Sequence, residues 1–252
     1  MKLDGKKILI TGASTGIGYA ISKELGKKGC YIAILARRED KLQALAEEIR
    51  KYGGQALAIP VDVMDADSVK QAITTANRDL DGLDVVIANA GVGILKPAHQ
   101  IEPRHVDRMV DVNLKGAMYT LLAGLDILLQ HGGGQLVGVS SIASYRGLPQ
   151  SSVYSATKAA LSSFLESLRV EYAKKNIRVT TICPGYIKTP MTEGAKMPMP
   201  MMLEADVAAR MIINAIEKEK KVYGFPWPMN FGVKLVRFLP NFIYDAVIKL
   251  VV

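Results

Sequence analysis

The sequence predicts one α/β domain built on a doubly wound parallel sheet with helices on both faces. Short apolar runs alternate along the chain with longer amphipathic stretches, and a glycine-rich turn follows the first run directly. The runs are rich in β-branched residues and nearly continuous, which is typical of strands buried on both faces. No repeat, low-complexity segment or linker separates a second domain. One compact unit is therefore expected.

The predicted strands are the apolar runs themselves. They cover residues 7–11, 31–36, 56–61, 83–90, 135–141 and 177–183, with 222–225 as the last strand. Helices are expected at 39–52, closed by Gly53-Gly54, and at 65–80, where Asp65 or Asp67 can cap the first-turn amides. A further long helix is expected around 107–130.

The composition is that of a globular protein with a large core. The chain has 252 residues, is 49% hydrophobic and 22% charged, and needs no disulfides at this size. Cys30 and Cys183 lie in apolar contexts, as expected for reduced thiols of a cytoplasmic protein. The first predicted strand begins so early that no signal peptide is expected. His99, His105 and His131 lack ligand spacing, so no metal site is predicted.

The net charge of +8 raises the question of a polyanionic partner. Basic residues are scattered and interleaved with acidic ones, which does not form a nucleic-acid footprint. The charge instead predicts a solvated basic surface that favours anionic cofactors or lipids. No nucleic-acid partner is expected.

The glycine-rich turn after the first run predicts a dinucleotide site. Its glycines are spaced G-x-x-x-G-x-G, and such a turn lets backbone amides and a helix N-terminus approach a pyrophosphate. A turn used only for packing is the alternative. The residues assigned to this part of the site are Gly12, Ser14, Thr15, Gly16, Ile17 and Gly18.

The end of the second run decides between two cofactors. An acid at this place would hold the ribose hydroxyls of NAD, but the sequence has Ala36 followed by Arg37 and Arg38. A guanidinium pairs well with a 2′-phosphate, so NADP is favoured over NAD. The alternative is that both arginines are ordinary surface charges at a helix start.

A second motif carries the chemistry. Tyr154 and Lys158 stand four residues apart in YSATK, on one face of a predicted helix, and Ser141 lies thirteen positions upstream. An ammonium group and an oxidised nicotinamide are expected to lower the pKa of the phenol, so that it can act as acid and base. Ser141, favoured over the adjacent Ser140 by its spacing, can hydrogen-bond the substrate oxygen. Taken alone, these residues could be a surface pair and a strand-end cap.

In this order and separation the two motifs resemble the short-chain dehydrogenase/reductase family over residues 3–225. The resemblance implies a Rossmann-type fold and hydride transfer between a nicotinamide and a carbonyl or alcohol carbon. It also implies cofactor contacts from Asp62, Val63, Asn89, Ala90, Gly91, Tyr154, Lys158, Pro184, Gly185, Ile187 and Thr189. Asn113 matches the family's fourth catalytic residue, which helps hold a water that links Lys158 to solvent.

The expected function is an NADP(H)-dependent carbonyl reductase or secondary-alcohol dehydrogenase with a lipophilic substrate. A β-ketoacyl-carrier-protein reductase is the first alternative, disfavoured by the C-terminal tail. A non-catalytic dinucleotide-sensing protein is the alternative of another class, disfavoured because all four catalytic positions are filled. A sugar epimerase of the extended branch would need a larger C-terminal domain.

Residues 1–225 form the expected catalytic domain, and 226–252 a C-terminal apolar and amphipathic extension of it. Substrate choice is expected from residues 93–100, from the segment after Thr189 and from the tail. The segment 191–202 holds five methionines, which predict either an adaptable lid or a loop packed on the body. These are Met191, Met197, Met199, Met201 and Met202.

The tail predicts two short apolar faces separated by Pro240. One face is expected to hold Phe231, Leu235, Phe238 and Leu239, and the next Phe242, Ala246, Val247 and Leu250. Interspersed charges disfavour a membrane span: Lys234, Arg237, Asp245 and Lys249. The tail is expected to cover the cleft or a partner subunit, or to anchor the protein peripherally at a membrane.

A homodimer or homotetramer is also expected. The helix of Tyr154 is apolar over more than the stripe that faces the sheet, and the stretch 107–130 is similarly apolar. The resemblance implies that these two helices pair across a twofold axis.

Overall fold

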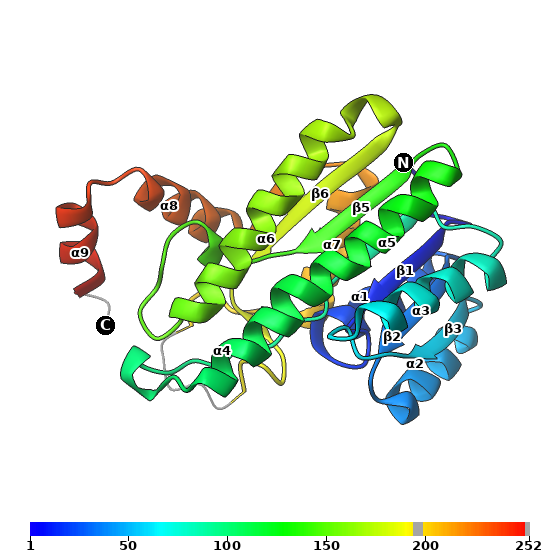
Figure 1. Ribbon diagram of the computed structural model, residues 1–252, viewed down its shortest axis with the longest axis horizontal. Coiled ribbons are helices and arrows are strands. Elements are labelled where there is room, and N and C mark those ends of the chain that lie inside the picture. The colour runs from blue at the N-terminus through cyan, green and yellow to red at the C-terminus, as the bar shows by residue number, and fades with distance from the viewer. Residues whose placement is uncertain (194–198, 250–252) are drawn as a thin grey trace.

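Seven parallel strands form the central sheet in the order β3-β2-β1-β4-β5-β6-β9 (Figure 1). The computed structural model describes residues 1–193 and 199–249, except for the side chains of Val247 and Lys249. The strands are β1 (Lys7–Thr11), β2 (Tyr31–Ala36), β3 (Gln55–Pro60), β4 (Val85–Ala88), β5 (Gly134–Val139), β6 (Ile177–Pro184) and β9 (Val222–Phe225). The strand order reverses direction between β1 and β4, and ligands of such sheets bind at that switch point. The predicted doubly wound architecture is confirmed.

β4 is shorter than the apolar run that predicted it, because polar groups end the ladder at both sides. Before the strand, the Asp84 carboxylate accepts hydrogen bonds from the Lys7 amide (2.9 Å) and the Lys6 ammonium (2.7 Å). After it, the Asn89 side-chain amide turns back to the Thr11 carbonyl at 3.0 Å. Asn89 therefore joins the carboxyl ends of β1 and β4, where the ligand site begins.

The helices cover the two faces of the sheet in separate layers. One hydrophobic core lies under α1 (Gly16–Lys27), α2 (Glu39–Lys51) and α7 (Ala205–Glu217). The other lies under α3 (Ala66–Asp79), α5 (Gly116–Gln130) and α6 (Ser152–Glu171). The side chain of Asp65, not that of Asp67, caps α3 by accepting hydrogen bonds from the amides of residues 67 and 68.

One continuous helical stretch runs from Pro103 to Gln130. It comprises α4 (Pro103–Val110), a π-helical turn at Asp111–Lys115 and α5. It is long and apolar enough to cross a membrane, but half of its most apolar window is buried, and α5 packs on β4, β5 and α3. Core packing thus accounts for its composition. The π turn widens the helix next to the ligand site, where such turns often occur.

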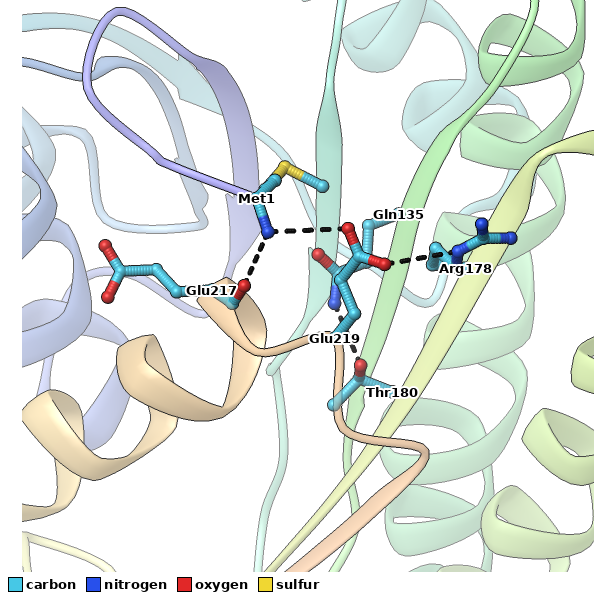
Figure 2. Close-up of polar contacts among 6 residues, drawn as sticks. All are labelled: Met1, Gln135, Arg178, Thr180, Glu217 and Glu219. Atoms are coloured by element: carbon cyan, nitrogen blue, oxygen red, sulfur yellow. Dashed lines mark hydrogen bonds and ion pairs between the residues drawn. The ribbon is translucent and has the colours of Figure 1, made fainter.

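Polar contacts hold the amino-terminal residue near the start of β6 (Figure 2). The Met1 amino group donates to the carbonyl of Glu217 and lies 3.4 Å from the Glu219 carboxylate. The same carboxylate accepts a hydrogen bond from Arg178 of β6 at 3.2 Å. These contacts connect the end of α7 to the sheet edge opposite the ligand site.

Short elements complete the chain. They are the 3₁₀ turns η1 (Ala98–Gln100), η3 (Ile142–Ser144) and η4 (Ala173–Lys175), the two-stranded sheet of β7 (Ile187–Lys188) and β8 (Leu203–Glu204), and the helices α8 (Trp227–Arg237) and α9 (Asn241–Lys249). Helices α8 and α9 project from one end of the molecule, away from the central sheet (Figure 1).

The tail divides near Pro240, as predicted, into two helices. Trp227, Phe231 and Leu235 are exposed on α8, and Phe238 and Phe242 are exposed around the turn that follows. Leu239, predicted on the same face, is only half-exposed. Two members of the second predicted face, the Val247 side chain and Leu250, lie outside the described residues, as do Met197 of the methionine segment and Pro198.

Candidate active site

A cavity of about 570 Å³ opens at the carboxyl ends of β1, β4, β5 and β6. That volume suits a small molecule. Every residue that the sequence assigned to cofactor contact lines this cavity, from the glycine-rich turn through Arg37 and Arg38 to Thr189. Ser141, Tyr154 and Lys158 line it too. Asn113 is the one predicted site residue that does not, because it lies buried behind the wall.

The glycines of the turn are required by contact as well as by conformation. A Cβ at Gly12 would lie 2.7 Å from the Ala90 Cα, and one at Gly18 would overlap the Gly12 carbonyl oxygen. Gly16 adopts φ +62°, a left-handed conformation that side chains disfavour. The turn therefore brings bare backbone to the cavity wall.

The start of α1 has unpaired donors that suit a diphosphate. Thr15 is the N-cap residue, and its side chain makes no hydrogen bond to the first-turn amides. These amides and the positive end of the helix dipole face a cavity lined by Ser14, Thr15 and Gly16. The donor set fits the pyrophosphate of a nicotinamide dinucleotide.

The two arginines after β2 have different surroundings. The Arg38 guanidinium donates to the hydroxyls of Ser14 (3.0 Å) and Thr15 (3.3 Å), which places it across the glycine-rich turn. Arg37 is also exposed and lies 3.9 Å from the Asp62 carboxylate. Both line the cavity. The first-turn acids of α2, Glu39 and Asp40, are not part of the lining.

The two neighbouring serines at the end of β5 have different hydrogen bonds. The Ser140 hydroxyl donates to the Lys158 carbonyl (3.0 Å) and pairs with Ser162 (2.7 Å). The Ser141 oxygen instead accepts from the Ala143 amide at 3.1 Å, which caps η3. Its own hydrogen makes a long contact of 3.4 Å to the Pro184 carbonyl. Ser141 is thus the serine that can donate into the cavity.

Burial controls the ionisation of Tyr154 and Lys158. Desolvation raises the pKa of the Tyr154 phenol, against a lowering contribution from the Ser141 hydroxyl. Desolvation lowers the pKa of Lys158 to about 8, and its ammonium donates to the Val139 carbonyl at 2.8 Å. Burial thus has the largest effect on this pKa among the protein groups, and the lowering expected from the ammonium together with a bound oxidised nicotinamide stays a prediction. Lys158 Nζ lies 5.8 Å from the centre of the Tyr154 ring.

Asn113 supports the site from behind. It sits fully buried in the π turn, where its amide accepts from the Val92 N–H (2.7 Å) and donates to the Val92 carbonyl (2.9 Å). A further hydrogen bond of 3.3 Å joins it to Thr157, beside Lys158 on α6. Through these contacts its side chain holds the loop that follows Asn89-Ala90-Gly91.

The cavity that holds Tyr154 is lined by several large apolar side chains. These include Val92, Leu95, Ile142, Leu148, Tyr186, Met191 and Met199. The Met191 sulfur lies next to Gly93, where an added Cβ would meet it at 3.1 Å. The segments predicted to choose the substrate supply Leu95, Met191 and Met199. Leu148 was missed, because the loop between Ser141 and Tyr154 has no sequence motif.

Among residues 1–193 and 199–249, no cluster of three His, Cys, Asp or Glu side chains could hold a metal ion. The donors around the cavity are instead hydroxyls, amides and cations. Such donors can bind the phosphates of an organic anion and can hydrogen-bond a polarised oxygen of a bound molecule.

Comparison with known proteins identifies this arrangement. The short chain dehydrogenase family model matches residues 6–199. The chain belongs to the short-chain dehydrogenase/reductase family. An uncharacterized oxidoreductase of Myxococcus xanthus is 37% identical over 238 residues, which is 94% of either chain. The protein is thus an oxidoreductase of this family.

Solved structures of short-chain dehydrogenases/reductases share the fold. A short-chain type dehydrogenase/reductase from Mycobacterium marinum superposes with a TM-score of 0.81, at 29% identity, over 88% of this chain and 93% of the other. Levodione reductase superposes with a TM-score of 0.84 over 90% and 98%. At 23% identity, the second likeness concerns the fold alone. Members of the family generally use a nicotinamide dinucleotide.

Proposed function

We propose that this short-chain dehydrogenase/reductase uses NADP(H) to interconvert a carbonyl and a secondary alcohol on a lipophilic substrate. The observation that carries the proposal is one cavity with two chemically different ends. Arg37, Arg38 and the start of α1 lie at one end, and Ser141, Tyr154 and Lys158 lie at the other. The bound cofactor would supply or accept the hydride.

The protein groups supply the proton and hold the oxygen. In the reductive direction Ser141 donates a hydrogen bond to the carbonyl oxygen, and Tyr154 donates its proton to that oxygen as negative charge develops there. The raised pKa of Tyr154 keeps the phenol protonated at neutral pH, ready for this step. Lys158, whose pKa is about 8, can return a proton to the site because it is mostly protonated at neutral pH.

The preference for NADP rests on charge. A 2′-phosphate near the end of β2 would meet two guanidinium groups, and Arg38 is already oriented by Ser14 and Thr15. Charge-assisted bonds of this kind are roughly twice as strong as neutral ones. The Asp62 carboxylate also lines the cavity, and it lies 3.9 Å from the Arg37 guanidinium.

The lipophilic substrate is inferred from the apolar wall beside Tyr154. Leu95, Leu148 and Met191 line the same cavity as Tyr154, and methionine adapts to varied apolar shapes. A polar or charged substrate would leave its groups unpaired against this wall. A medium-sized apolar ketone or its alcohol fits best.

A substrate panel tests the proposal. Purified protein is incubated with NADPH or NADH and with ketones, aldehydes or alcohols of increasing apolar size, and absorbance of the reduced cofactor is followed. The expected result is NADPH-dependent turnover whose KM falls as apolar size increases. Turnover with NADH alone would contradict the cofactor assignment, and a preference for small charged substrates would contradict the substrate class.

We also propose a homodimer or homotetramer in which the outer faces of α5 and α6 meet. Leu122 on α5 is 45% exposed, and Ala156, Ala159 and Phe164 on α6 face away from the core or are only partly buried. Light scattering at micromolar concentration tests this, and a monomer would contradict it. Leu122→Glu should shift the oligomer toward monomer.

A cytoplasmic location is proposed on the state of the cysteines. Cys30 and Cys183 are both free and buried thiols, as is usual in a reducing compartment. Cell fractionation with a marker enzyme tests this, and recovery in a secreted fraction would contradict it.

A further inference from the structure

Helix α8 presents an apolar stripe to solvent. Five large apolar side chains of α8 and the following turn are between 52% and 82% exposed: Trp227, Phe231, Leu235, Phe238 and Phe242. The first four recur at spacings of three or four residues, so they lie on one side of the helical path. Trp227 and Phe231 stack with ring centres 5.9 Å apart. Contiguous exposed patches of this kind mark interaction surfaces.

The stripe is not needed to fix α8 to the body. The opposite side of the helix, with Met229, Asn230, Val233 and Val236, is partly buried. Asn230 accepts a hydrogen bond from the Tyr145 hydroxyl at 3.1 Å. The helix therefore has an inner face that packs and a separate outer face that nothing in the described chain covers.

Arg146 fixes the orientation of the stripe. Its guanidinium donates to the Val236 carbonyl (2.7 Å), the Leu239 carbonyl (2.8 Å) and the Asn241 side chain (2.8 Å). It also lies 3.9 Å from the centre of the Tyr244 ring. These contacts satisfy the last carbonyls of α8 and hold the turn into α9 against the loop after β5. The outer face is presented in a fixed orientation, outside the body of the protein (Figure 1).

We propose that this stripe docks the protein on an anionic membrane surface. Tryptophan and phenylalanine on one helix face, with basic residues beside them, are typical of interfacial helices. Lys234 and Arg237 are exposed next to the stripe, and residues 226–252 contain three basic residues against one acidic residue. The whole chain carries a net charge of +8. Acidic lipid headgroups complement this charge.

The other occupants fit less well. An 11-residue helix is roughly 16 Å long, about half of the hydrocarbon core, so α8 lies on a membrane and does not cross it. A second copy docked through the stripe about a twofold axis would bring Lys234 and Arg237 of both copies close together. The outer faces of α5 and α6 offer a separate surface for subunit contact.

This inference does not depend on the proposed function, and the experiment separates the two. The chain has a single tryptophan, Trp227, which is 72% exposed, so its fluorescence reports on the stripe alone. The full-length protein is mixed with phosphatidylcholine vesicles, with or without phosphatidylglycerol, at low and high salt. The expected result is a blue shift and cosedimentation with the anionic vesicles, weakened by salt. NADPH oxidation with a small soluble ketone is followed in parallel.

Matched variants decide the assignment. Phe238→Asp combined with Phe242→Asp should weaken vesicle binding about tenfold or more, because two apolar anchors are lost. Tyr52→Asp, at an exposed aromatic residue beyond α2, should bind like the unchanged protein. Turnover of the small soluble ketone should be the same in all three proteins.

Three results would overturn the inference. They are no binding to either vesicle, equal binding by the double variant, and a smaller oligomer in the double variant without vesicle binding by the unchanged protein. The last result would assign the stripe to a second copy of the chain. Loss of ketone turnover in the unchanged protein would count against the proposed function only.

Discussion

The side-chain amide of Asn113 holds the backbone of Val92 through both of its polar atoms. It accepts from the Val92 N–H at 2.7 Å and donates to the Val92 carbonyl at 2.9 Å. This pairing joins the π turn of the long helix to the loop that carries Asn89 and Gly91. One buried side chain thus fixes the distance between the helix layer and the cavity wall.

Asn113→Ala should therefore loosen the wall of the site. The variant leaves the partly buried polar groups of Val92 without partners, at a cost of about 2–3 kcal/mol in the free energy of unfolding. Urea unfolding measures this, and kcat/KM should fall at least about tenfold. Asn214→Ala, at an exposed position of α7, is the control and should change neither quantity. Equal stability of the two variants would contradict the clamp.

Tyr154→Phe tests the proton donor. Removing the hydroxyl should lower kcat by about 10²–10⁴, since general acid catalysis contributes on that order. NADPH affinity, measured by fluorescence titration, should stay within about twofold because the ring remains. Tyr172→Phe, at the far end of α6, is the control. Retention of near-normal turnover by Tyr154→Phe would sink the mechanism.

The two arginines after β2 should select the cofactor. The double variant Arg37→Ala, Arg38→Ala is expected to lower the affinity for NADPH by about 10- to 100-fold, since two charge-assisted contacts are worth about 1.4–2.8 kcal/mol. NADH lacks the 2′-phosphate, so the affinity for NADH should change little. Titration of both cofactors measures the difference, with Arg50→Ala in the last turn of α2 as the control. Equal losses for the two cofactors would show that the arginines are not selective.

Burial of Lys158 should make stability depend on pH. Its pKa is about 8 in the folded protein, whereas a lysine in the unfolded chain titrates near ~10.4. Between these values the unfolded chain binds more protons, so this residue's contribution to stability rises with pH. Below pH 8 the folded protein carries the full free-energy cost of keeping this buried lysine protonated, and Lys158→Met removes that cost. Its stability relative to wild type should be about 1–3 kcal/mol higher at pH 7 than at pH 10.5.

Urea unfolding of both proteins at pH 7 and pH 10.5 measures that difference. Loss of the hydrogen bond to the Val139 carbonyl changes the free energy of unfolding of the variant by a similar amount at both pH values, so it cancels in the comparison. Other titrating groups are common to both proteins and cancel as well. A difference that does not change with pH would show that Lys158 keeps its ordinary pKa.

Arg146→Ala should release the tail from the loop between Ser141 and Tyr154. Hydrogen bonds to Val236, Leu239 and Asn241 are lost, and the melting temperature should fall by about 2–6 °C. Leu148 in the same loop lines the cavity, so KM for large apolar substrates should rise more than KM for small ones. Arg169→Ala, at a half-buried arginine of α6 that pairs with Glu166 of the same helix, is the control. An unchanged melting temperature would contradict the tether.

Much of the fold and the cofactor surroundings could be predicted because both depend on local pattern. The strands β1, β2 and β9 begin and end where their apolar runs do. Parallel strands also place their carboxyl ends at one edge, so motifs after β1, β2, β4 and β6 had to meet. Order along the chain was enough to bring these residues to one cavity.

The remaining features depend on contacts that no local pattern encodes. Arg146 meets Val236 and Asn241 across 90 or more residues. The π turn around Asn113 interrupts a helical periodicity although no proline or glycine lies within Asp111–Lys115. The pKa of Tyr154 depends on how completely the neighbouring segments exclude water, which the spacing of the motif does not encode.

The hydrogen bonds of Arg146 join the last two helices to the loop between Ser141 and Tyr154, so these segments are expected to move together as one unit. Thermodynamic linkage is reciprocal: a ligand that stabilises one arrangement of this unit changes the affinity at its other end by the same factor. A large apolar substrate that orders the loop around Leu148 would therefore strengthen attachment at the outer helices. Attachment would, in return, strengthen binding of such substrates, where lipophilic molecules are most concentrated.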